Sequence, residues 1–353
     1  MMFRRAWGGR GVLLAVAGVV LLAGCSRRKP AEVNDITAGF KVNRTRAPLG
    51  SAIEVTYTWT LGAGAKPLTK DYRALVHFVD GQGVVLFEDD HLPDPPTTSW
   101  KPGQTYTYNR TKFIPIYPYV GEVSVRMGLY KDRERVGLKG EDVGMLEYKV
   151  ASMELLPQTE NIFLVYKDGW HSPESSPSNP SQERTWTKKE ALVSFKNPKR
   201  DVIVYLEADT NYKAFAQPPV LTVSAGKNMG LTMPIESSEI FLKKIRFKAQ
   251  DLGDQDWVDM KLAMSQSFVP RLLTPPLNPD DRELGMMVYH LYVSEADKVG
   301  TPAGLQVVDA VAVGPQPVAV AKAGSKTTGK PAPAGVKPAS GKPAPSTPGG
   351  SRP

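Results

Sequence analysis

Apolar and polar positions alternate along most of this chain with a period of two. Within residues 51–61, every second residue from Ile53 to Leu61 is apolar, and Glu54 or threonines stand between them. This period, with β-branched and aromatic residues, is typical of a strand that buries one face. Residues 73–79 are apolar on both faces, which predicts a central strand, and the Asp80-Gly-Gln-Gly83 turn predicts a hairpin with residues 84–87. Further strands are predicted over residues 104–113, 122–130 and 145–155.

The same alternation resumes after a hinge predicted at residues 156–160. A long polar loop is predicted at 170–181, and residues 305–313 could form either a last strand or the start of a tail. Helical periodicity is nearly absent. The sequence therefore predicts an all-β chain of two tandem antiparallel β-sandwich domains, immunoglobulin-like or jelly-roll-like, at residues 35–156 and 161–297. Strands of the second domain are predicted at 162–166, 191–195, 202–208, 220–224, 240–248, 257–264 and 286–293.

The N-terminus has the layout of an export signal. Three arginines precede an apolar run at residues 12–22, which is shorter than the roughly 20 residues that cross a bilayer as a helix. Leu22-Ala23-Gly24-Cys25, which contains the single cysteine, resembles the lipobox of bacterial lipoproteins. The resemblance implies a signal peptide at 1–24, a diacylglyceryl thioether and an N-acyl chain on Cys25, and a lipidated linker at 25–34. Because Ser26 follows the cysteine, it also implies anchoring in the outer membrane with the body in the periplasm.

Charge is distributed unevenly along the chain. The formal net charge is +8, but three arginines lie in the signal, and residues 314–353 carry six basic residues and no acid. The body between them is close to neutral, which argues against a nucleic-acid-binding protein. Residues 314–353 contain 9 Pro and 7 Gly and no aromatic residue, a composition that predicts a disordered tail. This tail could be inert, or it could touch anionic lipid or cell wall.

No constellation typical of an enzyme is found in the sequence. The four histidines are not paired at the spacing of zinc ligands, and no Gly-x-Ser-x-Gly elbow is present. His77 and His290 fall within predicted strands and are expected to be packed residues. The acidic run at 251–259 lacks calcium-loop spacing and is predicted to be a solvated turn. Neither a cofactor nor a metal site is predicted, and a cation near His91, in Glu88-Asp-Asp-His91, is left open.

Short motifs in both domains resemble β-sandwich modules that accompany bacterial membrane glycosyltransferases. In the first domain they are Val76-His-Phe-Val-Asp80 and Ser99-Trp-Lys-Pro-Gly103; in the second they are Gly169-Trp-His-Ser-Pro-Glu174, Arg184-Thr-Trp-Thr187 and Asp281-Arg-Glu-Leu-Gly285. Because the multispanning catalytic part is absent from this sequence, the resemblance implies a place beside envelope glycan and not glycosyl transfer. Flat rings with polar neighbours suit sugars. The candidate glycan-binding residues are Trp170, Glu174, Arg184 and Trp186.

The function predicted from the sequence is therefore that of a membrane-anchored periplasmic lipoprotein. We expect a non-catalytic binding or scaffold module of the cell envelope that associates with glycan or with other envelope proteins. The membrane lipid is its predicted partner through acylated Cys25, and nucleic acid is not a partner. Two alternatives stay open: a carbohydrate-active hydrolase, whose carboxylates would be paired in space, and a purely structural subunit of an envelope assembly.

Overall fold

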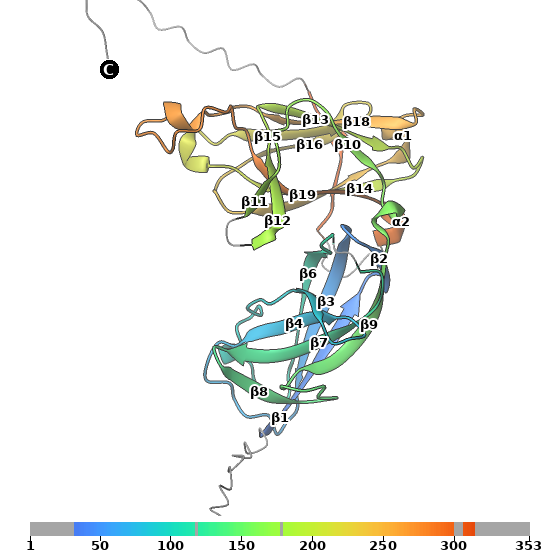
Figure 1. Cartoon of the computed structure of the whole chain (residues 1–353), viewed down its shortest axis with the longest axis vertical. Coiled ribbons are helices and arrows are strands. Elements are labelled where there is room, and N and C mark those ends of the chain that lie inside the picture. The colour runs from blue at the N-terminus through green and yellow to red at the C-terminus, as the bar shows by residue number, and fades with distance from the viewer. Residues whose placement is uncertain (1–31, 117–118, 177–178, 300–305, 315–353) are drawn as a thin grey trace, which may run out of the picture. The chain divides into compact units, whose positions relative to one another are not determined.

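The computed structural model describes residues 32–116, 119–176, 179–299 and 306–314 (Figure 1). The predicted signal peptide, Cys25 and the predicted tail beyond Gly314 lie outside the described residues. No helix in the described ranges is long and apolar enough to span a membrane. All described residues belong to one compact unit, which ends at Gln316.

The strands from β1 to β9 build the first β-sandwich. The connected path of strands runs β2-β9-β7-β8-β1-β3-β6, and β4 adds to β7 and carries β5 at the edge. β1, β3 and β6 pair antiparallel with one another and face the layer that contains β4, β7 and β9. The strands are β1 Val33–Val42, β2 Arg46–Pro48, β3 Ala52–Leu61, β4 Arg73–Val79, β5 Val85–Glu88, β6 Thr105–Phe113, β7 Gly121–Lys131, β8 Glu134–Lys139 and β9 Tyr148–Leu156.

Two six-stranded sheets build the second β-sandwich. One has the order β10-β13-β18-β15-β16-β21 and the other β11-β12-β19-β14-β17-β20. The strands are β10 Leu164–Tyr166, β11 Glu174–Ser176, β12 Asn179–Trp186, β13 Glu190–Lys196, β14 Val202–Asp209, β15 Val220–Ala225, β16 Met229–Pro234, β17 Phe241–Phe247, β18 Trp257–Met264, β19 Met287–Glu295, β20 Val308–Asp309 and β21 Val311–Ala312.

Helical segments are short and lie between strands. The 3-10 turns are η1 Thr97–Ser99, η2 Gln158–Glu160, η3 Tyr212–Ala214 and η4 Pro270–Leu272, and the α-helical turns are α1 Ala249–Leu252 and α2 Ala296–Val299. The near absence of helix agrees with the near absence of helical periodicity in the sequence.

Each sandwich has an apolar core made by the inward-facing residues of its strands. In the first, Tyr57, Trp59 and Phe78 are completely buried; in the second, Phe195 and Phe247 are. These are the alternating apolar positions from which the strands were predicted. A third cluster joins residues of both sandwiches: Ala52, Phe113, Ile203, Tyr205, Tyr292 and Val299. The predicted all-β fold of two antiparallel sandwiches is confirmed.

The structure differs from the predicted strands in a few places. It adds β1, β2, β8 and β16, for which no strand range was predicted, and it places β11 and the start of β12 inside the predicted 170–181 loop. β11 and β12 pair through a shifted register between Ser175 and Ser176, an irregularity that breaks the period-two pattern. The open alternative at residues 305–313 is resolved in favour of two short strands, β20 and β21.

Candidate functional site

An exposed aromatic surface lies on the outer face of the sheet that contains β10, β13 and β18. In β18, Val258 and Met260 point into the core, so Trp257 and Asp259 project outward between them. In the ladder between β13 and β18, Trp257 is opposite Lys196 and Asp259 is opposite Ser194. Trp257 is 45% exposed. We call the outward residues Phe163, Lys167, Ser194, Trp257 and Asp259 the Trp257 face.

Two aromatic rings meet on the Trp257 face. Phe163 is 64% exposed, and its ring stands edge-on to the indole of Trp257 at a centroid distance of 6.2 Å. Large apolar side chains are usually buried on folding, so rings left in water beside each other need an explanation. A ligand with a flat apolar surface would supply the missing contact.

Polar groups surround the indole and are held in place. Asp259 accepts hydrogen bonds from the Lys167 ammonium at 2.7 Å and from the Ser194 hydroxyl. The bond from Lys167, followed by that from Ser194, lowers the pKa of the Asp259 carboxyl, which is therefore an ionised acceptor at neutral pH. Its side chain is 72% exposed, so its remaining lone pairs are open to a ligand.

The Trp257 face borders a hollow whose lining is polar apart from the indole. Lys167, Asp254, Gln255, Asp256, Trp257 and Asp259 line it. The buried Asn197 fixes the loop that carries two of the acids, because its side-chain amide donates to the carbonyls of Gly253 and Gln255, both at 2.9 Å. The acidic run at 251–259, predicted to be a solvated turn, is an exposed bend only at residues 254–256, because Asp251 is half-buried in α1 and Asp259, although exposed, belongs to β18. The exposed bend also forms one wall of the hollow.

The four predicted glycan-binding residues lie together in the second sandwich. Glu174 and Arg184 are opposite each other in the β11–β12 ladder, and the backbone of Trp170 bridges to Thr187 beside Trp186. Both tryptophans are only partly exposed. The Trp170 indole N–H donates to the Leu192 carbonyl at 2.7 Å, which leaves it without a free donor.

Of the polar members of this group, Glu174 is engaged within the protein, whereas Arg184 leaves one nitrogen unpaired. Glu174 forms an ion pair with Arg282 at 2.7 Å. The Nε atom of Arg184 is buried without a hydrogen-bond partner, and the Trp186 ring packs edge-on against Phe268 at 5.9 Å. The structure therefore brings the predicted residues together, and the exposed Tyr166 ring stands edge-on to Trp170 at 4.8 Å. The two exposed rings of Phe163 and Trp257 stand on the Trp257 face.

A second polar region lies in the first sandwich, along the chain that follows β5. Residues 87–91 continue to pair with β4, so their side chains alternate between two faces. Phe87, Asp89 and His91 are buried, whereas Glu88 is exposed and Asp90 is half-buried. Residues 87–91 thus contribute side chains to two separate clusters, one inside the sandwich and one on its outer face.

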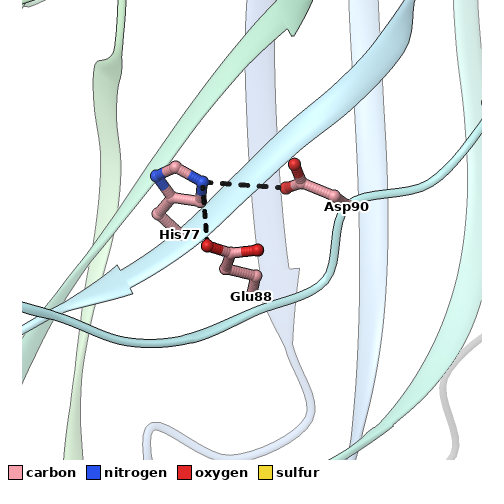
Figure 2. Close-up of side chains that lie close together, drawn as sticks. All are labelled: His77, Glu88 and Asp90. Atoms are coloured by element: carbon pink, nitrogen blue, oxygen red, sulfur yellow. Dashed lines mark ion pairs between the residues drawn. The ribbon is translucent and has the colours of Figure 1, made fainter. Parts of the chain in front are cut away.

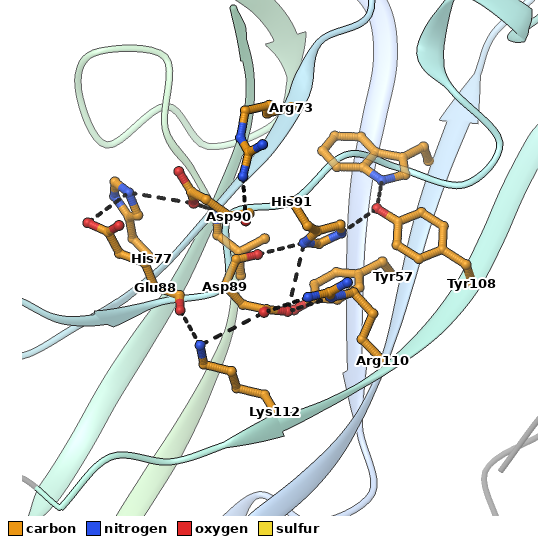
Figure 3. A network of polar contacts seen from close by, with 12 residues as sticks. Tyr57, Arg73, His77, Glu88, Asp89, Asp90, His91, Tyr108, Arg110 and Lys112 are labelled. Atoms are coloured by element: carbon orange, nitrogen blue, oxygen red, sulfur yellow. Dashed lines mark hydrogen bonds and ion pairs between the residues drawn. The ribbon is translucent and has the colours of Figure 1, made fainter. Parts of the chain in front are cut away.

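The inner cluster is a closed network around the Asp89 carboxylate (Figure 3). Tyr57 donates its hydroxyl to Asp89 at 2.8 Å, and Arg110 donates from two nitrogens at 3.1 and 3.2 Å. Lys112 is 3.9 Å away from the same carboxylate. Asp89 is 6% exposed, so a charge that would be costly alone is compensated by paired donors.

His91 extends this network toward the opposite layer. Its Nδ1 lies 2.6 Å from the Asp89 carbonyl and its Nε2 lies 2.8 Å from the Tyr108 hydroxyl, to which the Trp59 indole also donates. Burial lowers the pKa of His91 and raises that of Tyr57, so both are uncharged at neutral pH. Both His91 nitrogens are engaged inside the protein, which makes His91 a structural residue.

The outer cluster brings a histidine and two carboxylates together (Figure 2). His77 in β4 is opposite Glu88 across the hairpin, and Asp90 follows two residues later on the same face. The His77 Nε2 atom lies 3.8 Å from a Glu88 oxygen and 3.9 Å from an Asp90 oxygen. We call His77, Glu88 and Asp90 the His77 cluster. Their ligand atoms all lie within 4.8 Å of one another.

The sequence indicated neither Phe163 and Trp257 nor the grouping of His77 with Glu88 and Asp90. Trp257 begins a strand, and strand aromatics are usually buried, so no pattern marks it as exposed. The acids beside His91 drew attention in the sequence, but His91 and Asp89 point inward, and His77 takes the place opposite Glu88. A register shift between Phe78 and Val79 sets this pairing, and a turn sequence alone does not reveal such a bulge.

Comparison with known proteins identifies no family for the chain. No protein-family model and no curated protein matches the sequence. Among solved structures, it is similar to a family GH115 4-O-methyl-alpha-glucuronidase with specificity for decorated arabinogalactans, at 13% identity and a TM-score of 0.28. That match covers 43% of this chain and only 20% of the glucuronidase.

Two further structures are similar over more of the chain. The CBM22-1-CBM22-2 tandem domain of Paenibacillus barcinonensis Xyn10C matches 75% of this chain and 95% of its own length, at 11% identity and a TM-score of 0.22. The M60 catalytic domain with two CBM51 domains of Clostridium perfringens ZmpB is similar at 7% identity and a TM-score of 0.22. That match covers 76% of this chain and 32% of the ZmpB chain. At these TM-scores the likenesses carry no argument about function.

Proposed function

We propose that this chain is a lipid-anchored, non-catalytic glycan-binding module of the bacterial cell envelope. The resemblance of residues 22–25 to a lipobox supports the membrane anchoring, and the Trp257 face supports the glycan binding. The observation that supports the proposed activity is an exposed indole beside a hollow that is lined by three carboxylates.

The chemistry of the Trp257 face suits a sugar. A pyranose ring has an apolar C–H face that packs on an aromatic ring, and hydroxyls around its rim that donate to carboxylates. Trp257 and Phe163 supply the rings, and Asp259 supplies an ionised acceptor fixed by Lys167. Groups that are held in place before the ligand arrives lose less conformational entropy on binding.

The charge of the hollow indicates which glycans it would accept. Three aspartates line it, and lysines pair with two of them, Lys167 with Asp259 and Lys199 with Asp256, so the hollow has little net charge with which to attract a charged polysaccharide. We therefore propose an uncharged glycan chain as the ligand. Because the Trp257 face lies on the outer surface of a sheet, a long glycan can bind there through sugars in the middle of its chain.

Replacing Trp257 with alanine is expected to weaken glycan binding at least about tenfold, since it removes the stacking surface without emptying the core. The measurement is isothermal titration of the full chain, purified in detergent, with cellohexaose, chitohexaose and xylohexaose, and with an anionic oligogalacturonate that should not bind. Trp186→Ala serves as the comparison, with thermal unfolding to verify that both variants are folded.

The comparison variant separates the two surfaces of the second sandwich. Loss of binding in Trp186→Ala, with Trp257→Ala unchanged, would place the site at Trp170, Glu174, Arg184 and Trp186 instead. Unchanged binding in both variants would contradict a glycan site on this sandwich. Release of shorter oligosaccharides during the titration would favour the hydrolase alternative.

The anchoring part of the proposal predicts a modified cysteine. Mass spectrometry of the protein from its native membrane should find a mature chain that begins at Cys25, heavier than the bare sequence by a diacylglyceryl group and an acyl chain. Several acyl chains are needed for a stable anchor, since one holds only marginally. Cys25→Ser should leave the chain unprocessed. An unmodified thiol on an intact N-terminus would contradict the anchoring.

A further inference from the structure

The His77 cluster leaves its central histidine without hydrogen bonds to the groups around it. The Nε2 atom is 3.8 and 3.9 Å from the Glu88 and Asp90 oxygens, beyond the length of a hydrogen bond. On the other side of the ring, Nδ1 is buried and has no hydrogen-bond partner. We propose that the His77 cluster binds a divalent transition-metal ion, with Zn²⁺ as the ion of best fit.

The spacing of the three side chains fits ligands that share an ion better than it fits direct contact. Two ligands at about 2.0–2.1 Å from a tetrahedral Zn²⁺ are about 3.3–3.4 Å apart. The separations of Glu88 and Asp90 from the His77 Nε2 atom exceed this by about half an ångström, and all three ligand atoms lie within 4.8 Å of one another. Glu88 can close the gap, because its side chain is 56% exposed and free to rotate. Figure 2 shows the two carboxylates converging on the same ring nitrogen from different sides.

Groups behind the ligands are arranged as they are in metal sites. A histidine that binds a metal usually donates its other N–H to a carboxylate, which fixes its orientation. Here the Glu147 carboxylate lies 3.4 Å from the His77 Nδ1 atom, close to this position but without a hydrogen bond to it, and Arg135 donates to Glu147 at 3.0 Å. Asp90 accepts a hydrogen bond from the Val76 backbone N–H at 2.8 Å, which fixes the second ligand.

Charge and donor type narrow the choice of ion. Two carboxylates and a neutral imidazole balance the charge of a divalent cation. Imidazole suits Zn²⁺ and its transition-metal neighbours, whereas Ca²⁺ and Mg²⁺ prefer oxygen donors alone. The exposure of Glu88 leaves room for water to complete the coordination. Because the ligands come from β4 and from the segment after it, an ion would tie the β5 edge of the sheet to its neighbour.

The rival interpretation is a simple ion-pair cluster, in which a protonated His77 balances the carboxylates and no metal binds. The two differ in what Zn²⁺ does to the protein. The test uses the full chain in detergent, without a polyhistidine tag and freed of metal by chelation. Zn²⁺ binding is followed by isothermal titration and by the thermal unfolding temperature, with Ca²⁺ as the control ion.

We expect one Zn²⁺ per chain at low micromolar affinity and a rise of the unfolding temperature by a few degrees at saturating Zn²⁺. Glu88→Ala should weaken binding at least about 100-fold, and Glu147→Gln about 10–100-fold. Glu154→Ala is the matched control, because Glu154 is an exposed strand glutamate of the same sandwich that pairs with Arg46. It should leave Zn²⁺ binding unchanged.

Several results would overturn the metal site. These are the absence of Zn²⁺ binding below the millimolar range, equal stabilisation by Ca²⁺, and binding that survives both Glu88→Ala and His77→Gln. The last result would mean that the ion sits elsewhere on the chain. Because His77→Gln could disturb the sheet, Glu88→Ala, which alters an exposed side chain, carries the decision.

Discussion

Replacing Glu54 with leucine is expected to lower the free energy of unfolding by about 3–5 kcal/mol, because it leaves the buried Lys244 ammonium without a carboxylate to pair with. Lys244 donates to the Glu54 carboxylate at 2.9 Å, and the two side chains are 10% and 5% exposed. Glu54 belongs to β3 and Lys244 to β17, so this pair joins the two sandwiches. The measurement is urea-induced unfolding followed by tryptophan fluorescence.

The double variant Glu54→Leu/Lys244→Met shows whether the stability is lost because a buried charge is left unpaired or because the ion pair itself stabilises the fold. Apolar replacement of both partners of a buried ion pair is often neutral or stabilising. The hydroxyls of Thr111, which donates to Glu54 at 2.9 Å, and of Tyr205, which also hydrogen-bonds to Glu54, would then lose their partner. We expect the double variant to unfold within about 1–2 kcal/mol of the native protein. A double variant as unstable as the single one would refute this explanation.

Replacing Asp89 with alanine is expected to cost about 2–4 kcal/mol of unfolding free energy. It removes charge-assisted hydrogen bonds from Tyr57 and Arg110, each of which contributes about 1.5–3 kcal/mol. Arg110 is 40% exposed, so water replaces part of what it loses, and the expected total lies below the sum. Thermal and urea unfolding measure the change.

A matched aspartate shows whether burial is the cause. Asp71 accepts hydrogen bonds from the hydroxyl and backbone N–H of Thr98, but it lies at the surface. Asp71→Ala should therefore change the stability much less than Asp89→Ala. Similar losses in the two variants would show that the network around Asp89 does not stabilise the fold as described. Asp89→Ala should also weaken Zn²⁺ binding, because Asp89 holds the segment that carries Glu88 and Asp90.

The fold could be predicted to a large extent because strands with one buried face have a regular period. Apolar and polar residues alternate from Ile53 to Leu61, and the structure has β3 at Ala52–Leu61. β4 at Arg73–Val79 agrees with the predicted central strand. The strands that escaped prediction carry weaker patterns. β8 contains Gly137, whose backbone lies against that of Glu32, and β16 contains Gly230, which packs against Val223.

The candidate sites could be predicted only in part, because sites depend on which residues meet in space. The sequence placed Glu174 near Arg184 through a resemblance, and the ladder does pair them. It gave no reason to prefer Trp257 over Trp170, since exposure is decided by the partner strands. The pairing of His77 with Glu88 depends on a register shift in a hairpin, and a shift of one residue exchanges the two faces of a strand.

The most direct test of the proposed glycan-binding function is a crystal structure of the chain with an uncharged hexasaccharide that binds in titration. We predict a pyranose ring stacked on the indole of Trp257, with hydroxyls donating to Asp259 and to the acidic wall of the hollow. A saccharide bound elsewhere, with Trp257 still open to solvent, would contradict the account.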